Sequence, residues 1–248
     1  MWPYSKVIAH RGGGTLAPEN TLAGMRCGLA HGFRAVEFDV MLSSDRIPVL
    51  MHDPQFGRTV RGGGRVCDTS AAELAAMDAG AWLSAEFAGE PVPTYEQVVE
   101  FCRANGIWMN VEIKPSPGFE QETGEVVARF TQQLFAGETD VRKLPLFSSF
   151  SYAALRAAQG AAPGIPRGYL LKSLPADWAK QLRALEATAL HTDHKNLTRE
   201  QAAAVKEAGY GLFCYTVNTP ERAQEILGWG VDAFCTDRID LIGPDFAG

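Results

Sequence analysis

Residues 35–53, AVEFDVMLSSDRIPVLMHD, place an apolar run, a short polar turn and a second apolar run in immediate succession. Glu37 and Asp39 stand two residues apart in the first run, and side chains at i and i+2 of a β-strand point to the same face. The polar turn at residues 43–46 is short enough to reverse the chain into a hairpin. We therefore expect the second run to fold back on the first and to bring His52 close to both carboxylates.

The two carboxylates of this stretch need a counter-charge. Like charges held on one face repel each other strongly, and a hard cation such as Mg²⁺ or Ca²⁺, which prefers carboxylate oxygens, removes that repulsion. The simpler alternative is an amphipathic hairpin with two exposed acids. The stretch by itself leaves both interpretations open, and the rest of the chain has to decide between them.

The composition is that of a globular chain that repels polyanions. Of its 248 residues, 46% are hydrophobic and 21% are charged, which is ordinary for a chain that buries a sizeable core. The net charge of -6 repels nucleic acid and anionic lipid, so an anionic substrate needs a local basic site. No uninterrupted apolar stretch reaches the ~18 residues of a membrane span, and the N-terminus has no signal-peptide pattern. We expect a cytosolic protein with no membrane span and no nucleic-acid partner.

The cysteines are odd in number, scattered and free of any CxxC spacing, so they indicate neither a zinc site nor a disulfide framework. We expect all five to be reduced and to pack as small apolar residues. They are Cys27, Cys67, Cys102, Cys214 and Cys235.

Short apolar runs alternate with helical patterns along the chain. Eight such runs begin at Val7, Ala35, Trp108, Leu144, Arg167, Ala187, Gly211 and Val231. Each run but the last precedes a helical pattern, and this alternation indicates a parallel α/β fold. Eight units predict a (β/α)₈ TIM barrel in a single domain over residues 1–248, with a doubly wound open sheet as the alternative. The hairpin decides the count, because residues 47–51 would otherwise make a ninth strand.

Residues 54–93 do not follow this repeat. They contain an RGGGR loop and a helical pattern near residues 71–78, and they are too few for an independent domain with a sound core. We expect an insertion over the barrel mouth, as a lid or a wall of a pocket. Its arginines, Arg58, Arg61 and Arg65, are expected to be solvated rather than to touch a substrate.

Chemically useful side chains follow several of the predicted strands. Active sites of such barrels form at the C-terminal strand ends. The candidates there are His10, Arg11, Glu37, Asp39, Glu112, Lys114, Phe150, His191, Asp193, Tyr215, Asn218 and Asp237, with His52 added by the hairpin. Three carboxylates suit a hard metal ion, two histidines can exchange protons near neutral pH, and an arginine with a lysine can hold a phosphate. This set favours cleavage of a phosphoester.

Taken singly, these residues have simpler interpretations. A lone histidine at a strand end is usually structural or exposed, and Glu112 with Lys114 can be a surface salt bridge. His191 and His194 are three residues apart at a predicted strand end, so their side chains are not expected to share a metal ion. Only the combined pattern indicates a site.

Five short motifs in this order resemble the glycerophosphodiester phosphodiesterase family. They are HRG at 10–12, PENT at 18–21, ExD at 37–39, HD at 52–53 and EIK at 112–114. The resemblance continues through MDAGAW at 77–82, GEPVPT at 89–94, YTVN at 215–218 and CTD at 235–237. It is especially similar to cytosolic bacterial members of that family.

The resemblance implies a barrel of the kind found in phosphoinositide-specific phospholipases C, with one divalent cation, Mg²⁺ or Ca²⁺. It assigns the metal to Glu37, Asp39 and Glu112, the acid/base pair to His10 and His52, and phosphate binding to Arg11 and Lys114. Tyr215 stands where many members of the family carry tryptophan. This difference keeps an aromatic wall and adds a hydroxyl group.

The implied reaction is hydrolysis of glycerophosphodiesters such as glycerophosphocholine and glycerophosphoethanolamine to sn-glycerol 3-phosphate and an alcohol. We expect His10 to act as base, His52 as acid, and Phe150 and Tyr215 to form an aromatic wall for small head groups. Attack by water and attack by the substrate's own 2-hydroxyl through a cyclic phosphate both remain open. Alternative functions are a phospholipase or lysophospholipase D, a catalytically inactive glycerol-phosphate sensor and a structural barrel. A homo-oligomer is also left open.

Overall fold

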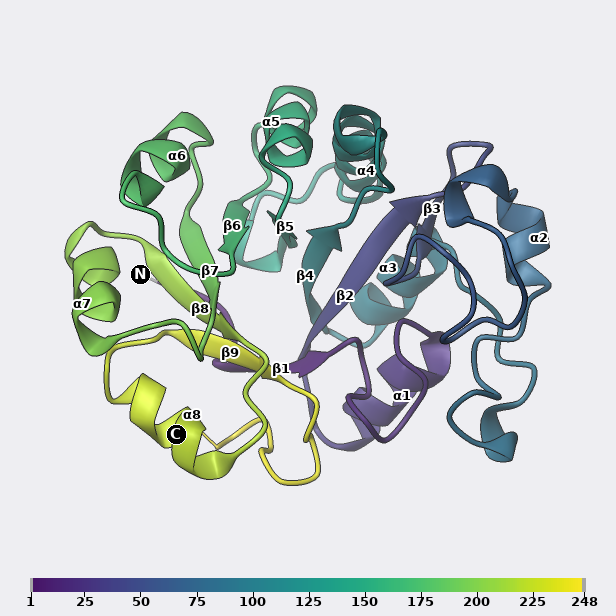
Figure 1. The fold of residues 1–248 in the computed structure, drawn as a ribbon, viewed down its shortest axis with the longest axis horizontal. Coiled ribbons are helices and arrows are strands. Elements are labelled where there is room, and N and C mark those ends of the chain that lie inside the picture. Colours follow the sequence, from purple (N-terminus) through teal and green to yellow (C-terminus); the bar gives the residue numbers. More distant parts are fainter. Residues whose placement is uncertain (1, 247–248) are drawn as a thin grey trace.

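Eight parallel strands form a closed ring in the computed structural model, which describes residues 2–246 (Figure 1). They are β1 (Val7–His10), β2 (Ala35–Leu42), β4 (Trp108–Ile113), β5 (Leu146–Ser149), β6 (Arg167–Leu171), β7 (Ala189–Asp193), β8 (Gly211–Tyr215) and β9 (Ala233–Thr236). The ring closes because β1 pairs in parallel with both β9 and β2. The predicted (β/α)₈ barrel is therefore confirmed, and the open sheet is excluded by this closure.

The helices lie outside the ring (Figure 1). They are α1 (Leu22–Ala30), α3 (Tyr95–Ala104), α4 (Glu120–Leu134), α5 (Tyr152–Ala161), α6 (Trp178–Ala184), α7 (Arg199–Glu207) and α8 (Pro220–Leu227), and a short η3 (Val141–Lys143) precedes β5. Local sequence fixes several starts: Thr94 and Thr198 cap α3 and α7 through capping boxes, and the Thr21 side chain accepts a hydrogen bond at the start of α1.

The predicted hairpin is also present. Strand β3 (Pro48–Leu50) runs antiparallel to β2, with Val40 opposite Leu50 and Leu42 opposite Pro48. Strand β3 pairs with the last residues of β2, beyond the part of β2 that pairs with β1. It is therefore not a ninth strand of the barrel. The hairpin leaves His52 just past β3, on the side of the carboxylates of β2.

Residues 54–93 contain η1 (Val66–Asp68), α2 (Ala71–Ala75) and η2 (Ala85–Phe87) and no barrel strand. They share a small hydrophobic cluster with the hairpin, which includes Met41, Val49, Val66 and Leu74. The segment thus packs on the hairpin that β2 and β3 form. Its description as an insertion within one domain stays a prediction.

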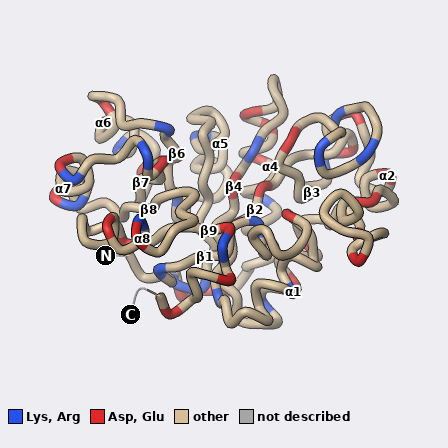
Figure 2. Tube along the Cα trace, turned by 60° about the horizontal axis from the view of Figure 1, so that its bottom comes forward, with Lys and Arg blue, Asp and Glu red and all other residues tan. Residues whose placement is uncertain are grey.

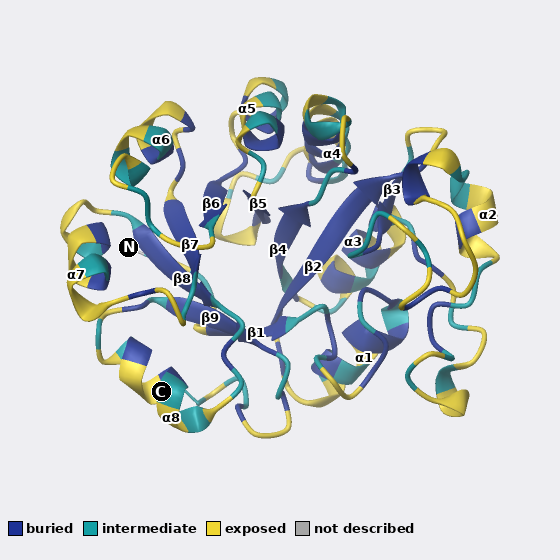
Figure 3. Cartoon of the chain, in the orientation of Figure 1, coloured by how far each residue is buried: buried dark blue, intermediate teal, exposed yellow. Residues whose placement is uncertain are grey.

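The strands are buried, whereas the outer faces of the helices are exposed (Figure 3). The buried strand side chains belong to two separate hydrophobic clusters. One set of side chains packs against the helices, and Ile8, Ala35, Phe213 and Ala233 belong to a separate cluster with Trp2 and Trp108. The five cysteines are free, and all but Cys27 are buried, which agrees with the predicted packing role.

Acidic and basic residues are interspersed along the outer elements (Figure 2). Among residues 2–246, no helix has the length and apolar character needed to cross a bilayer. The cytosolic location stays a prediction.

Candidate active site

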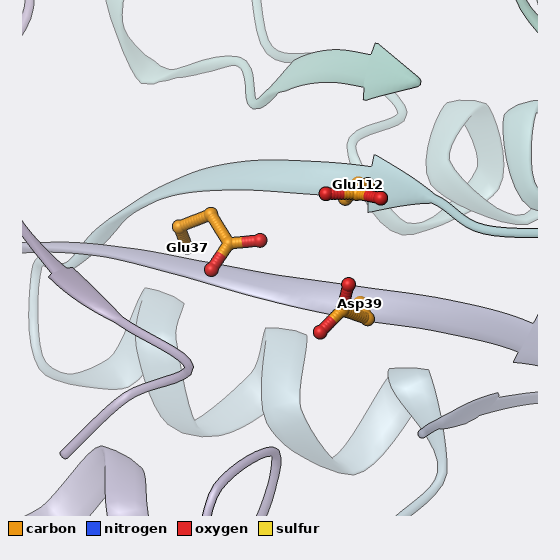
Figure 4. A group of neighbouring side chains, drawn as sticks. All are labelled: Glu37, Asp39 and Glu112. Atoms are coloured by element: carbon orange, nitrogen blue, oxygen red, sulfur yellow. The ribbon is translucent and has the colours of Figure 1, made fainter. Parts of the chain in front are cut away.

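Three carboxylates of β2 and β4 converge at the C-terminal side of the ring, where Glu37 lies opposite His10, the last residue of β1. Asp39 lies opposite Glu112 in the strand register, and Glu37 lies two residues earlier on the same face of β2 (Figure 4). One oxygen from each of Glu37, Asp39 and Glu112 lies within 4.8 Å of the others, and all three residues are buried. The i,i+2 spacing of the ExD motif places two of these groups, and the parallel pairing of β4 supplies the third.

The electrostatics of this carboxylate cluster favour a cation. Burial raises the pKa of Glu37 to about 7, and burial followed by the charge of Asp39 raises the pKa of Glu112 to about 8. Burial also acts to raise the pKa of Asp39, but Lys114 and Arg11 outweigh it and hold that pKa well below its ordinary value. A divalent cation would stabilise the ionised form of all three groups, and oxygen-only donors suit Mg²⁺ or Ca²⁺, so the donor set fits a hard metal ion.

His10 ends β1 between two carboxylates. Its Nε2 lies 3.6 Å from Oε2 of Glu37, and its Nδ1 lies 2.5 Å from Oδ1 of Asp237. Burial acts to lower the pKa of His10, but Glu37 and Asp237 outweigh it and raise that pKa. Asn218 donates to the second oxygen of Asp237 at 2.9 Å and accepts from its backbone N–H. The imidazole is therefore held with Nε2 toward the carboxylate cluster.

The loop after β1 comes very close to Asp237. Thr15 donates its backbone N–H to the carbonyl of Asp237, and Gly14 has a φ of +55°. A Cβ at position 14 would lie 2.1 Å from that carbonyl oxygen, so only glycine fits there. The glycine-rich HRGGG stretch is thus explained by close packing beside the site.

His52 reaches the same cavity from the hairpin. Its Nδ1 lies 2.6 Å from Oδ1 of Asp53, so both histidines have an aspartate at Nδ1. Burial is the largest influence on His52 and lowers its pKa, with the charges of Arg11 and Lys114 acting in the same direction. The two histidines thus share a geometry while their pKa values shift in opposite directions.

Two cations complete the polar wall. The Nζ of Lys114 lies 3.1 Å from Asp39 and 3.5 Å from Glu112. Arg11 adopts a left-handed backbone with a φ of 53°, and its backbone N–H donates to Glu37 at 3.2 Å. Its guanidinium lies 2.8 Å from Glu19 and 3.6 Å from Asp39.

Three further residues hold these groups, and of them only Asp237 was among the candidates that the sequence placed at the strand ends. Asn20 donates to Oδ2 of Asp39 at 2.9 Å and accepts from the Asp39 backbone N–H at 3.0 Å. Asp237 orients His10, and Glu19 accepts from Arg11. The PENT motif contains Glu19 and Asn20, and the CTD motif contains Asp237. The local spacing of these residues does not predict which side chain each of them binds.

Arg58 is ion-paired rather than only solvated, which differs from the expectation for the insertion. Its guanidinium donates to both oxygens of Glu19 at 2.7 Å and to Asp53 at 2.6 Å. It therefore links the aspartate behind His52 to the glutamate behind Arg11. Arg65 instead pairs with the nearby Asp68.

These side chains surround a cavity of about 210 Å³. Its lining is formed by His10, Arg11, Glu37, His52, Asn110, Glu112, Lys114, Ser148, Phe150, Leu170, Phe213, Tyr215, Thr216 and Cys235. Phe150 and Tyr215 meet edge to face, with ring centroids 5.6 Å apart, at the exposed side of the cavity. No residue of the described segment 54–93 belongs to this lining.

Two histidines lie apart from the site. His191 is fully buried beside Phe213, with ring centroids 4.5 Å apart, and His194 contacts Arg222. The prediction that they do not bind a metal together stays a prediction, although their separate surroundings agree with it.

A closed (β/α)₈ barrel with a carboxylate cluster, paired histidines and adjacent cations at its C-terminal strand ends defines a phosphodiester-hydrolase class of site. The model of the glycerophosphoryl diester phosphodiesterase family matches residues 10–241, and the chain belongs to this family. The prediction of an enzyme of this family is confirmed.

The relatives cover almost the whole chain. A glycerophosphodiester phosphodiesterase of Caldanaerobacter subterraneus subsp. tengcongensis is 32% identical over 236 residues, 93% of each chain. The structure of an Oleispira antarctica phosphodiesterase in complex with the product sn-glycerol-3-phosphate shares 37% identity and a TM-score of 0.87, covering 94% of this chain and 93% of that one. A glycerophosphodiester phosphodiesterase structure from Agrobacterium tumefaciens is 26% identical, with a TM-score of 0.78 and 98% coverage of both chains.

Proposed function

We propose that this protein hydrolyses glycerophosphodiesters, such as glycerophosphocholine and glycerophosphoethanolamine, to sn-glycerol 3-phosphate and an alcohol. The observation that carries the proposal is that His10, His52, Glu37 and Glu112 all line the same cavity. Each histidine has a carboxylate at Nδ1, which leaves its Nε2 available for proton transfer. The family membership and the product named for the Oleispira relative support the same substrate class.

The carboxylate cluster of Glu37, Asp39 and Glu112 would hold one divalent cation, Mg²⁺ or Ca²⁺. A metal ion bound there would supply Lewis-acid stabilisation of negative charge on the phosphate and would make the attacking hydroxyl group or water easier to deprotonate. Arg11 and Lys114 carry the remaining positive charge, and they bind and orient the phosphate and stabilise charge that develops on its oxygens.

The two histidines move the protons. His10, oriented by Asp237, takes the proton of the nucleophile, which is water or the 2-hydroxyl of the glycerol. A new phosphorus–oxygen bond forms, the bond to the head-group oxygen breaks, and His52 protonates that oxygen as the alcohol leaves. Each transfer is typically worth about 10² to 10⁴ in rate. With 2-hydroxyl attack, water then opens the cyclic phosphate with the roles reversed.

The aromatic pair Phe150 and Tyr215 lies at the exposed side of the cavity, where a small head group would rest. Phe150 is 48% exposed, and Tyr215 donates its hydroxyl to the carbonyl of Leu171. A choline or ethanolamine cation is attracted to such ring faces. This supports small polar head groups over long acyl chains.

The first test is release of glycerol 3-phosphate from glycerophosphocholine with Mg²⁺, Ca²⁺ or EDTA. We expect metal-dependent release by the wild type and loss of release in Glu37→Ala/Asp39→Ala. Glu96→Ala/Glu100→Ala, which removes two exposed acids from α3, is the matched control and should keep full activity. No release by the folded wild type with any metal would refute the proposal, and activity on lysophosphatidylcholine alone would favour a lysophospholipase D.

The leaving group tests the assignment of the histidines. We expect His52→Ala to lose most turnover of glycerophosphocholine and much less turnover of a diester with p-nitrophenol, which leaves without protonation. His10→Ala should impair both substrates. Unimpaired turnover of glycerophosphocholine by His52→Ala would rule out the acid role.

A further inference from the structure

Two motifs of the sequence, MDAGAW at 77–82 and GEPVPT at 89–94, form one loop that does not line the active-site cavity. The Asp78 carboxylate accepts hydrogen bonds from three backbone N–H groups of this loop, at 2.8, 2.8 and 2.9 Å. Gly80 fits tightly, because a Cβ there would lie 2.0 Å from a backbone carbonyl oxygen of the same loop. The carbonyl of Glu90 accepts a hydrogen bond from the MDAGAW backbone at 2.7 Å. The two motifs therefore fix the position of the Glu90 backbone.

The side chain of Glu90 reaches from this loop to the N-terminus of α1. Ala23 donates its backbone N–H to Oε1 of Glu90 at 2.7 Å, and Arg26 donates to Oε2 at 3.2 Å. The first N–H groups of a helix have no partner within the helix, and the Thr21 side chain already accepts from Gly24. Helix α1 has no acidic residue in its own first turn. Glu90 thus supplies, from another segment, the carboxylate that the positive end of a helix favours.

The turn before α1 carries the side chain that holds Asp39. Asn20 donates to Oδ2 of Asp39 at 2.9 Å and accepts from the Asp39 backbone N–H at 3.0 Å. Asn20 is buried and has a φ of 58°, a conformation that L residues rarely adopt. Ala23 follows Asn20 by only three residues. The hydrogen bond from Ala23 to Glu90 therefore lies within one helical turn of the residue that orients Asp39.

The same turn is also held at its other end by segment 54–93. Glu19 accepts from Arg58 at 2.7 Å on both carboxylate oxygens, and it accepts from Arg11 at 2.8 Å. Arg58 and Glu90 come from opposite ends of the segment, and the turn at residues 18–21 lies between their two contacts. The segment thus reaches the site by holding this turn.

We propose that Glu90 is a positioning residue of the active site, which fixes the N-terminus of α1 and thereby holds Asn20 against Asp39. The inference rests on the proposed function, because Asp39 is one of the three carboxylates that would hold the divalent cation. Glu90 does not line the cavity, so its effect reaches the site only through the turn. This role accounts for the two motifs that form the loop.

The test measures the dissociation constant of Mg²⁺ and of Ca²⁺ by calorimetry, without substrate. Loss of a partner directly behind a metal ligand typically costs about 10- to 100-fold in metal affinity. Glu90 is one step further away, so we expect Glu90→Ala to raise the dissociation constant by roughly 3- to 10-fold. In Glu90→Gln the amide oxygen still accepts the Ala23 N–H, so this conservative variant should stay within about 2-fold of the wild type.

Two controls separate positioning from stability. Glu86→Ala, at an exposed glutamate of the same loop, should leave metal binding unchanged. Thr198→Ala removes the side-chain cap of α7, on the opposite side of the ring (Figure 1), and loss of a cap lowers stability. Its Tm should fall while its metal binding stays that of the wild type. Thermal unfolding of each variant gives the comparison.

A double variant tests the route through Asn20. If Glu90 acts through this residue, adding Glu90→Ala to Asn20→Gly should weaken metal binding by less than about 2-fold more, because the two changes break one chain of contacts. A full additional loss would show another route and would overturn the inference. If Glu90→Ala does not fold, Arg26→Met removes only the guanidinium beside the Glu90 carboxylate and should also weaken metal binding; an unchanged dissociation constant would then overturn the inference.

The role of Glu90 is refuted by wild-type metal binding in Glu90→Ala, by an equal loss in Glu90→Ala and Thr198→Ala, or by a wild type that binds neither ion. These outcomes are distinguishable from failure of the proposed function, which hydrolysis of glycerophosphocholine decides. A wild type that hydrolyses this diester, with normal metal binding in Glu90→Ala, removes only the positioning role. Weaker metal binding in Glu90→Ala, with no hydrolysis by the wild type, removes only the enzymatic proposal.

Discussion

Nδ1 of His10 lies 2.5 Å from Oδ1 of Asp237, although 227 positions separate the two residues in the chain. The closure of the barrel brings them together, because β1 pairs with β9 and Ala9 lies opposite Thr236. Asp237 is in turn held by Asn218. A carboxylate in this position fixes the tautomer and the orientation of an imidazole.

Asp237→Asn should therefore lower kcat on glycerophosphocholine by at least about 10-fold with a smaller change in KM, since the amide keeps the shape but loses the charge. Removal of a charge that raises the pKa of His10 should shift the acidic limb of the pH–rate profile to lower pH. Asp140→Asn, at a half-buried aspartate outside the site, is the control. An unchanged kcat and profile would show that Asp237 does not act through His10.

Asn20 holds Asp39 at two points, and its backbone has a φ of 58°. Partners behind a metal ligand typically contribute about 10- to 100-fold to metal affinity. We expect Asn20→Gly, which keeps the left-handed backbone accessible, to raise the Mg²⁺ or Ca²⁺ concentration for half-maximal activity by that factor. Asn20→Ala should add backbone strain and a lower Tm. Wild-type metal dependence in both variants would contradict the role.

Arg58 joins Glu19 and Asp53, and through them Arg11 and His52. Loss of this link should let His52 and Arg11 leave their productive orientation, which commonly reduces rates by about 10- to 100-fold. We expect Arg58→Met to lower kcat/KM in this range and Arg58→Lys to restore it only in part, since lysine cannot donate to both carboxylates in a forked geometry.

Arg61→Met, in the same segment and exposed, is the control for Arg58. Steady-state kinetics and thermal unfolding separate orientation from stability. Equal activity of Arg58→Met and Arg61→Met would show that Arg58 is only a surface residue.

The burial of His191 should make the folded protein less stable at low pH. Burial lowers its pKa to about 3 from 6.5, and neither ring nitrogen has a hydrogen-bond partner. Below about pH 6.5 the unfolded chain binds a proton that the folded protein does not, so stability is present above this pH and is lost as the pH falls toward 3. The loss from this group between pH 7 and pH 5 is about 2 kcal/mol.

His191→Leu should remove this part of the pH dependence of the free energy of unfolding, measured with urea at pH 7 and pH 5. His191→Gln serves if the leucine variant does not fold, and exposed His31→Gln is the control. The same slope in His191→Leu and the wild type would contradict a neutral buried His191.

The sequence allowed the repeating fold and the main site residues to be predicted, because these depend on local periodicity. Alternation of short apolar runs with helical patterns predicts eight β/α units, and a four-residue polar turn predicts the β2–β3 hairpin. The ExD spacing places Glu37 and Asp39 on one face of a strand whatever the rest of the chain does. The motifs then indicate the family, which the family model confirms.

The contacts that hold the site depend on tertiary structure. Whether Asp237 meets His10 depends on barrel closure, and whether Glu112 lies opposite Asp39 depends on strand register. Arg58 lies in an irregular segment, where no periodicity shows that it meets Glu19. Sequence by itself determined which strand faces and ends carry the chemical groups, because side-chain direction follows from backbone periodicity. Only the closed ring decided which groups touch, because the parallel strands that carry them are distant along the chain and are brought into register by the fold.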